Sequence, residues 1–263
     1  MTFGMPFLLE TATVEDACRL CRELGLSFVE LNANFPACQA ECLHPDELLR
    51  LKASYGIDFT FHVEEECDPF AFQGRIRDAW LYTLRQTMTL AVSAGMPVIN
   101  MHLPHGVYIT LPGERVYLYA RCRDRYIRAV EALRSLCEAC LQGSDVCIAI
   151  ENTDGFQPHE QEAVDLLLAS PRFGLTLDIG HCHGAGNADL PFYQERAERL
   201  IHMHGHDALG RKNHLALGDG EIDLVARFAW AEENNARVVL ETKTIAALRT
   251  SVARLPSYLP GRE

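Results

Sequence analysis

Short apolar runs alternate with amphipathic stretches from one end of the 263-residue chain to the other. Runs of four to six residues rich in Val, Ile, Leu and Phe predict strands, and stretches with helical spacing of apolar residues predict the helices between them. Eight strands are expected, at 6–9, 28–32, 58–63, 97–102, 146–151, 174–178, 200–205 and 237–241. Eight helices are expected, at 14–25, 45–55, 75–94, 115–142, 159–169, 191–198, 222–234 and 244–255.

This alternation predicts the fold class. A strand, a helix and a further parallel strand form a right-handed crossover, and eight such units in a chain of this length suit a closed α/β barrel. We therefore expect a single (β/α)8 TIM barrel domain that spans residues 1–263. An open doubly wound sheet is the alternative, and it is disfavoured because no glycine-rich phosphate-binding turn follows the first expected strand.

The composition of the chain limits the kinds of partner that it is expected to bind. The chain has 36 acidic and 24 basic residues, and its formal net charge of −12 opposes binding to DNA or to an anionic membrane. No apolar run reaches the ~20 residues that a membrane helix needs, and the N-terminus does not read as a secretory leader. The cytoplasm is the expected location. A homo-oligomer is left open, since the mixed helix faces single out no interface.

Ten cysteines are a high count, and four of them form two pairs with a spacing of three residues. Cys18 and Cys21 fall in one expected helix, and Cys137 and Cys140 fall in another. A zinc or redox site is one interpretation of such pairs. Packing of small apolar side chains on one helix face is the favoured interpretation, because neither pair lies in a tight loop.

Polar residues recur where the expected strands end, and barrel enzymes place their active sites at these ends. The residues at the ends of six successive strands and in the loop after the seventh are His62, His102, Glu151, Asp178 with His181, His204, Glu241 and His214. Imidazoles and carboxylates are the ligands of Zn²⁺ and Mn²⁺. Since a buried acid without a partner costs several kcal/mol, the recurrence predicts a divalent metal site at the mouth of the barrel.

Each of these residues also has an ordinary structural explanation. A carboxylate at a strand end often caps the following helix, and a single histidine more often forms structural hydrogen bonds than it binds a metal. These explanations treat each residue alone. They do not explain why the same residue types recur at equivalent points of successive units, and this recurrence favours the metal site.

Four segments carry a resemblance to a known family: IENTDGF, LDIGHCHGAG, IHMHGHDALGRKNHLALGDGEID and VVLET. With FHVEE and NMHLPH, they resemble the xylose isomerase-like TIM barrel superfamily, which includes sugar isomerases and epimerases and endonuclease IV-like phosphodiesterases. In its ketose epimerases one metal is held by a Glu, an Asp, a His and a Glu. The resemblance implies that Glu151, Asp178, His204 and Glu241 are these ligands. It also implies that the two glutamates transfer the proton and that His181 contacts the substrate.

The endonuclease IV-like members hold more ions, and the resemblance extends to some of their ligands. His62 and His102 match two histidines that hold a second metal bridged by Glu151. His181 and His214 match ligands of a third, but Lys212 stands where the family has an aspartate ligand. A protonated lysine repels a cation, so we expect one or two ions, zinc or manganese. Lys212 either binds a substrate phosphate or hydroxyl or stays solvated.

The sequence specifies the reaction less closely than the site, because members of the superfamily catalyse several reactions with the same fold. The favoured hypothesis is a metal-dependent isomerase or epimerase of a small sugar, sugar phosphate or related polyol, with His181 and His214 orienting hydroxyls. The alternatives are a zinc-dependent phosphodiesterase of the AP endonuclease type and a polyol dehydratase. A binding protein on a retained barrel ranks last. The acidic balance and the absence of an obvious basic, aromatic loop argue against DNA as partner.

Overall fold

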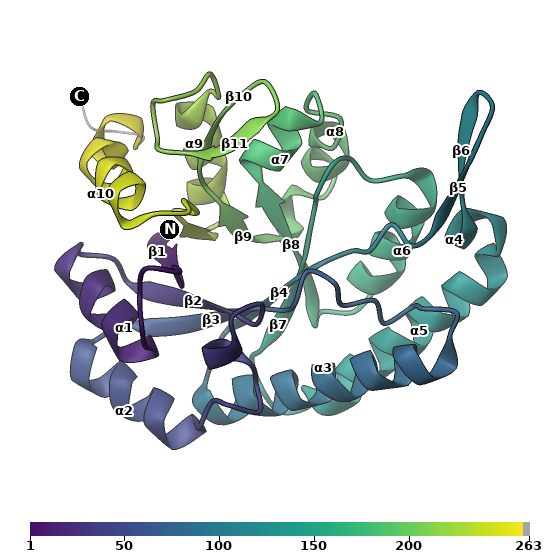
Figure 1. Ribbon diagram of the computed structural model, residues 1–263, viewed down its shortest axis with the longest axis horizontal. Coiled ribbons are helices and arrows are strands. Elements are labelled where there is room, and N and C mark those ends of the chain that lie inside the picture. The colour runs from purple at the N-terminus through teal and green to yellow at the C-terminus, as the bar shows by residue number, and fades with distance from the viewer. Residues whose placement is uncertain (260–263) are drawn as a thin grey trace.

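The computed structural model describes residues 1–259 and shows a closed barrel of eight parallel strands (Figure 1). The strands follow the order β1-β12-β9-β8-β7-β4-β3-β2 around the barrel. Their bounds are Thr2–Pro6 for β1, Phe28–Asn32 for β2, Asp58–His62 for β3, Val98–His102 for β4, Cys147–Glu151 for β7, Phe173–Asp178 for β8, Leu200–His204 for β9 and Arg237–Val239 for β12. The predicted (β/α)8 barrel is confirmed. The extent of the domain over 1–263 stays a prediction, and 260–263 lie outside the described residues.

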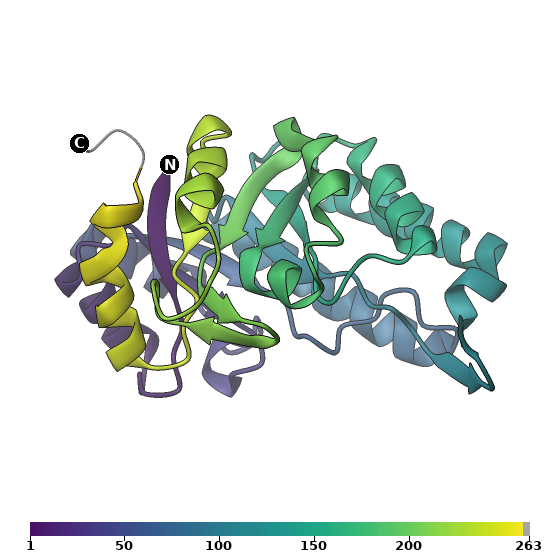
Figure 2. The same cartoon turned by 90° about the horizontal axis from the view of Figure 1, so that it is seen from above.

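Helices cover the outside of the barrel, as two perpendicular views show (Figures 1 and 2). Their bounds are Val14–Glu23 for α1, Pro45–Tyr55 for α2, Gly74–Ala94 for α3, Leu118–Arg121 for α4, Arg123–Cys140 for α5, Pro158–Leu168 for α6, Ile179–Gly184 for α7, Leu190–Gln194 for α8, Leu224–Glu233 for α9 and Ile245–Arg254 for α10. Short 3-10 turns lie at Pro36–Cys38, Ala197–Arg199 and Leu255–Tyr258. None of the helices within residues 1–259 is long and apolar enough to cross a membrane.

The first strand begins four residues earlier than the sequence pattern predicts. The apolar run 6–9 was the expected strand, but β1 pairs with β12 and β2 through Thr2–Pro6. Gly4 explains the difference: it pairs with Phe28, and a Cβ at Gly4 would lie 2.5 Å from the Phe28 ring. Glycine has a low propensity for strands. The apolar pattern therefore did not show that Gly4 belongs to the strand.

The prediction of a helix over 115–142 is wrong in its first part. A hairpin of β5 (Tyr108–Leu111) and β6 (Glu114–Tyr117) occupies this region and extends from the body of the molecule (Figure 1). Its turn contains Gly113 with a φ of 99°, which favours glycine. The helix expected at 191–198 is also shorter, because α8 ends at Gln194.

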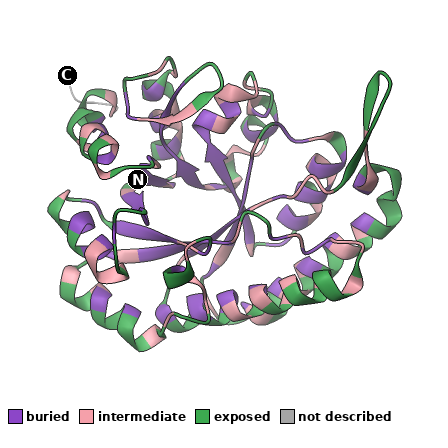
Figure 3. Ribbon diagram, in the orientation of Figure 1, coloured by how far each residue is buried: buried purple, intermediate pink, exposed green. Residues whose placement is uncertain are grey.

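The barrel strands and the surrounding helices differ in burial (Figure 3). The barrel strands are mostly buried, whereas the helices alternate buried and exposed positions and the β5–β6 hairpin is mostly exposed. Cys18, Cys21 and Cys137 are buried and Cys140 is half-buried, which confirms packing for three of the four paired cysteines. Burial raises the pKa of Cys18 and Cys21 to about 12, so these thiols stay protonated.

Candidate metal centre

The four residues that the resemblance implies as metal ligands lie close together inside the mouth of the barrel. His204 ends β9, and its Nδ1 lies 3.0 Å from Glu151 Oε1, 3.1 Å from Glu241 Oε2 and 3.7 Å from Asp178 Oδ2. Glu151 ends β7, Asp178 ends β8, and Glu241 follows β12 by two residues. Neighbouring parallel strands end at the same mouth, and this arrangement brings residues separated by up to 90 positions together.

The donor atoms of this cluster fit a divalent cation. Asp178, His204 and Glu241 each offer a ligand atom within 4.8 Å of the others. Three carboxylates and one imidazole nitrogen are a donor set that Zn²⁺ and Mn²⁺ accept. Glu151, Asp178 and His204 are all at most 1 % exposed, and that much buried negative charge requires compensation.

The carboxylates of the cluster stay ionised because imidazoles surround them. Burial alone would raise the pKa of Glu151, but the charges of His204 and His102 outweigh it and hold the pKa well below its ordinary value. His204 acts in the same direction on the pKa of Glu241, which is also held well below its usual range against the effect of burial. Ionised carboxylates of this kind are able to bind a cation or accept a proton.

His62 and His102 form a second group around the other oxygen of Glu151. His62 Nε2 lies 3.3 Å and His102 Nε2 lies 3.2 Å from Glu151 Oε2. Nδ1 of His62 lies 2.6 Å from the carbonyl of Val63. Since that carbonyl is an acceptor, Nδ1 carries a hydrogen. Burial would lower the pKa of His62, but the hydrogen bond with Glu151 raises this pKa to about 9. Glu151 therefore faces two ligand groups, one with each oxygen.

Asp178 has a partner that the sequence did not single out. His206 Nε2 lies 3.0 Å from Asp178 Oδ1, and His206 Nδ1 accepts a hydrogen bond of 2.9 Å from the backbone N–H of His214. Its hydrogen is therefore on Nε2 and points to the carboxylate. Gly180 permits this contact, because a Cβ at Gly180 would overlap the His206 ring.

The remaining predicted residues lie around the centre at different depths. His214, on β11 (Lys212–Leu215), packs against His206 with ring centroids 4.3 Å apart, and its carboxylate neighbour is Glu241. His181 lies on α7, with its ring 5.4 Å from that of His214. His206, His214 and Glu241 lie close enough together to hold a metal ion, and His181 is not part of this group. Lys212 is exposed on β11.

Two further residues near the centre were not among the predicted site residues. Glu30 on β2 and His202 on β9 are buried one layer deeper in the barrel. Glu30 contacts both His202 and His204. The available signal was the alternation of the strands, since Glu30 and His202 point inward from apolar runs where a polar residue needs a partner.

Two hollows adjoin the centre. One of about 340 Å³ is lined by Phe7, Phe35 and Asn34 together with Glu241 and Lys243. The Lys243 ammonium donates to Glu241 Oε1 at 2.9 Å. These residues combine apolar walls with a few polar groups, as small-molecule sites do.

The other hollow, of about 360 Å³, is more polar. Its lining includes Arg115, Thr153, His181, Arg211 and Asn213. Arg211 and Asn213 flank Lys212 in sequence, so a basic residue next to the predicted one lines the space beside His181. The volumes of both hollows suit a small molecule.

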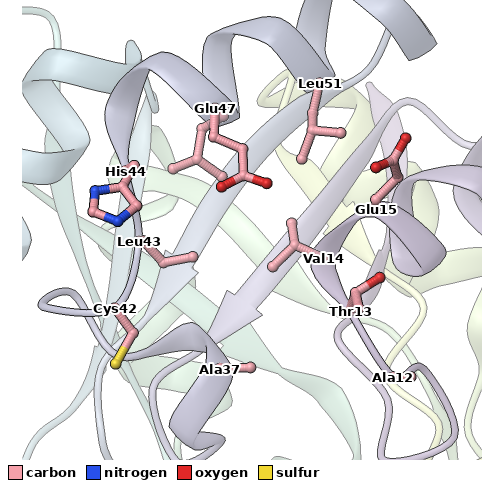
Figure 4. Close-up of a pocket in the computed structure, with 11 residues that line it drawn as sticks. Ala12, Thr13, Val14, Glu15, Ala37, Cys42, Leu43, His44, Glu47 and Leu51 are labelled. Carbon is pink, nitrogen blue, oxygen red and sulfur yellow. The ribbon is translucent and has the colours of Figure 1, made fainter.

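A third hollow of about 300 Å³ lies between the starts of α1 and α2 (Figure 4). Thr13 and Glu15 line one side, and Cys42, His44 and Glu47 line the other. None of the residues around it belongs to the ligand cluster. We therefore assign it no part in the site.

The geometry defines the class of protein as a (β/α)8 barrel with a cluster of carboxylates and imidazoles at the carboxyl ends of its strands. Proteins of this class act through residues at that face. The family model described as "Xylose isomerase-like TIM barrel" matches residues 18–258. The chain belongs to this family.

Several solved structures share the fold at low sequence identity. A D-tagatose 3-epimerase-like protein is 21% identical, with a TM-score of 0.78 over 98% of this chain and 97% of the other. D-psicose 3-epimerase from Clostridium cellulolyticum H10, solved with D-tagatose, is 16% identical, with a TM-score of 0.73 over 98% of each chain. The IolI protein with a zinc atom is 15% identical, with a TM-score of 0.75 over 98% of each chain.

Proposed function

We propose that the protein is a metal-dependent isomerase or epimerase of a small sugar, sugar phosphate or related polyol. One observation carries this proposal: His204 Nδ1 lies 3.0 Å, 3.7 Å and 3.1 Å from carboxylate oxygens of Glu151, Asp178 and Glu241. The similar structures of sugar epimerases and of the zinc-containing IolI protein support it. One or two ions, zinc or manganese, suit the donor atoms. The cytoplasm, expected from the sequence, suits a small-sugar substrate.

Glu151 and Glu241 are the proposed proton carriers. A divalent cation held by the four ligands supplies the positive charge that stabilises negative charge developing on the substrate oxygens. Glu151 Oε1 and Glu241 Oε2 both face His204 Nδ1 from different strands. One ionised glutamate removes a proton from carbon, and the other returns to carbon a proton that it has taken up from solvent. Each cycle leaves the two glutamates with exchanged protons, which solvent resets.

The substrate is proposed to lie between the two hollows that adjoin Glu241 and His181. His181 and His214 orient hydroxyl groups, as the resemblance implies. Lys243, which the sequence did not single out, holds Glu241 Oε1 at 2.9 Å and leaves Oε2 toward the centre. Lys212 is exposed beside the polar hollow, so it reaches only a group that extends out of the site, such as a phosphate.

Exchange of carbon-bound hydrogen with solvent tests the proposal directly. The protein with added Mn²⁺ or Zn²⁺ is incubated in D₂O with ketohexoses, including D-tagatose, and with their phosphates, and ¹H NMR follows the loss of C–H signals. Proton transfer predicts deuterium at the carbon next to the carbonyl in at least one compound. Glu241→Gln is expected to abolish it, and Glu47→Gln, at the third hollow, serves as the matched control. No exchange with any of these compounds contradicts the proposal.

A phosphodiesterase is the second candidate, and a specific observation favours it. His62 and His102 approach Glu151 Oε2 within 3.3 Å, which supplies a second ligand group next to the first. Two adjacent ions are typical of phosphate-ester hydrolysis. Zinc-dependent hydrolysis of bis(p-nitrophenyl) phosphate, without any deuterium exchange in sugars, would establish this candidate in place of the first.

A further inference from the structure

Glu30 is a buried carboxylate that lies beneath the proposed metal centre. It is 2 % exposed and extends from the middle of β2 into the barrel. His204 Nε2 lies 2.8 Å from Glu30 Oε1, on the side of the imidazole ring opposite to the metal-facing Nδ1. The imidazole of His204 therefore bridges two carboxylate environments, with Glu30 on one nitrogen and the ligand cluster on the other.

Three hydrogen bonds hold Glu30 in place. Its Oε1 accepts from His204, and its Oε2 accepts from His202 Nε2 at 2.8 Å and from the Thr60 hydroxyl at 3.1 Å. Two imidazole nitrogens and one hydroxyl lie at hydrogen-bond distance from the two oxygens of Glu30, and this is the arrangement of donors around an ionised carboxylate. An ionised carboxylate only accepts hydrogen bonds. Both imidazoles therefore carry hydrogen on Nε2.

We infer that Glu30 is the positioning residue for His204: it fixes the hydrogen on Nε2 and so directs the lone pair of Nδ1 toward Glu151, Asp178 and Glu241. This inference rests on the metal centre of the proposed function. A carboxylate on the far nitrogen of a metal-binding histidine fixes its ring orientation and strengthens it as a ligand. A neutral acceptor fixes the orientation with less effect on ligand strength.

His202 supports the same interpretation. It is fully buried, and among the described residues its Nδ1 has no hydrogen-bond partner. Within residues 1–259 its side chain makes one hydrogen-bond contact, from Nε2 to Glu30 Oε2. Leaving a buried polar atom unpaired is costly. His202 thus holds Glu30 Oε2, which leaves Oε1 aligned with His204.

Zinc affinity of Glu30→Gln tests the role of Glu30. Competition with a chelator measures Zn²⁺ binding, and the visible absorption of the Co²⁺-loaded protein reports on the ligand environment. Glu30→Gln is expected to bind Zn²⁺ roughly 10- to 100-fold more weakly and to shift the Co²⁺ spectrum. Thr60→Val, which removes a hydrogen bond to the oxygen that does not face His204, is expected to change zinc affinity less than about threefold. Equal zinc affinity and equal Co²⁺ spectra in wild type and Glu30→Gln overturn the inference.

Two results distinguish a failure of this inference from a failure of the proposed function on which it rests. Wild-type protein that binds no Zn²⁺ refutes the metal centre itself. Wild-type protein that binds Zn²⁺ as tightly as Glu30→Gln refutes only the role of Glu30. ¹⁵N NMR of histidine side chains in the zinc-loaded wild type covers the case in which the variant fails to fold. Hydrogen on Nε2 of His204 is expected, and hydrogen on Nδ1 overturns the inference.

Discussion

Replacement of Asp178 by asparagine separates its role as a helix cap from its contact with His204. One carboxylate oxygen accepts a hydrogen bond of 2.6 Å from the His181 backbone N–H and caps α7, and the other lies 3.7 Å from His204 Nδ1. Asparagine caps helices about as well as aspartate. Asp178→Asn therefore keeps the cap but removes the negative charge that a cation requires, and its amide nitrogen then faces either the cation or His206 Nε2.

The expected loss follows from the number of ligands. Changing an outer partner of a ligand already costs up to ~100-fold in metal affinity, so we take about 100-fold as the minimum for a direct ligand. With Zn²⁺ at about 1,000 times the wild-type Kd, the ion stabilises the wild type by ~4.1 kcal/mol, whereas it stabilises the variant by only ~1.4 kcal/mol. The difference of ~2.7 kcal/mol corresponds to roughly 5–10 °C in Tm for a chain of this size.

Thermal unfolding with and without Zn²⁺ measures this difference. The quantity compared is the rise in Tm caused by the metal, so any change in the metal-free variant cancels. Asp223→Asn is the matched control, because Asp223 caps α9 through Ala226 at 3.0 Å and lies outside the cluster. The control is expected to keep the full rise. If Asp178→Asn keeps it as well, Asp178 does not bind the metal and the reasoning is refuted.

Three further changes have definite expected outcomes. His105 donates a hydrogen bond to the Glu160 carboxylate, which raises the pKa of His105 from 6.5 to about 9. The contribution of this bond to stability is therefore complete below pH 6.5 and is lost as the pH rises through about 9. Urea unfolding should show that His105→Gln costs ~2 kcal/mol at pH 6 and much less at pH 10; an equal cost at both values would contradict the assigned cause. Gly180→Ala displaces the His206 ring and should lower zinc affinity in calorimetry, and an unchanged Kd counts against the packing argument. Lys212→Ala should lower kcat/KM for a phosphorylated substrate more than for its unphosphorylated counterpart, and equal effects in steady-state kinetics remove Lys212 from the site.

The barrel was predictable because its pattern repeats. Each apolar strand is followed by an amphipathic helix, and the same alternation recurs eight times, so an error in one unit does not change the fold. The error in β1 shows the limit. Gly4 belongs to the strand because the Phe28 ring of β2 leaves no room for a side chain, and that contact exists only after the strands pair.

The hairpin at 108–117 was missed for a different reason. Val107, Tyr108, Ile109 and Leu111 are all exposed, so they lack the alternation of buried and exposed positions by which a strand is recognised. The helical spacing of α5 was extended backwards across Arg115. Only the backbone pairing of β5 with β6 distinguishes this segment from a helix.

The ligand cluster was predictable where polar residues end strands, and less so where they lie within them. Glu151, Asp178, His204 and Glu241 were identified from their recurrence, and the structure brings them together. Glu30 lies inside β2, where sequence shows one acid in an apolar run and gives no indication of its partner. Its contact with His204 spans 174 positions and depends on closure of the barrel.

Crystals soaked in Zn²⁺ or Mn²⁺ and measured across the absorption edge of the ion provide the most direct measurement. Anomalous difference density should appear between His204 Nδ1 and the carboxylates of Glu151, Asp178 and Glu241, at about 2.0–2.2 Å from each ligand atom for zinc. A second peak near His62 and His102 would give the ion count of two. Density confined to other parts of the molecule, with these four side chains free of metal, would contradict the account.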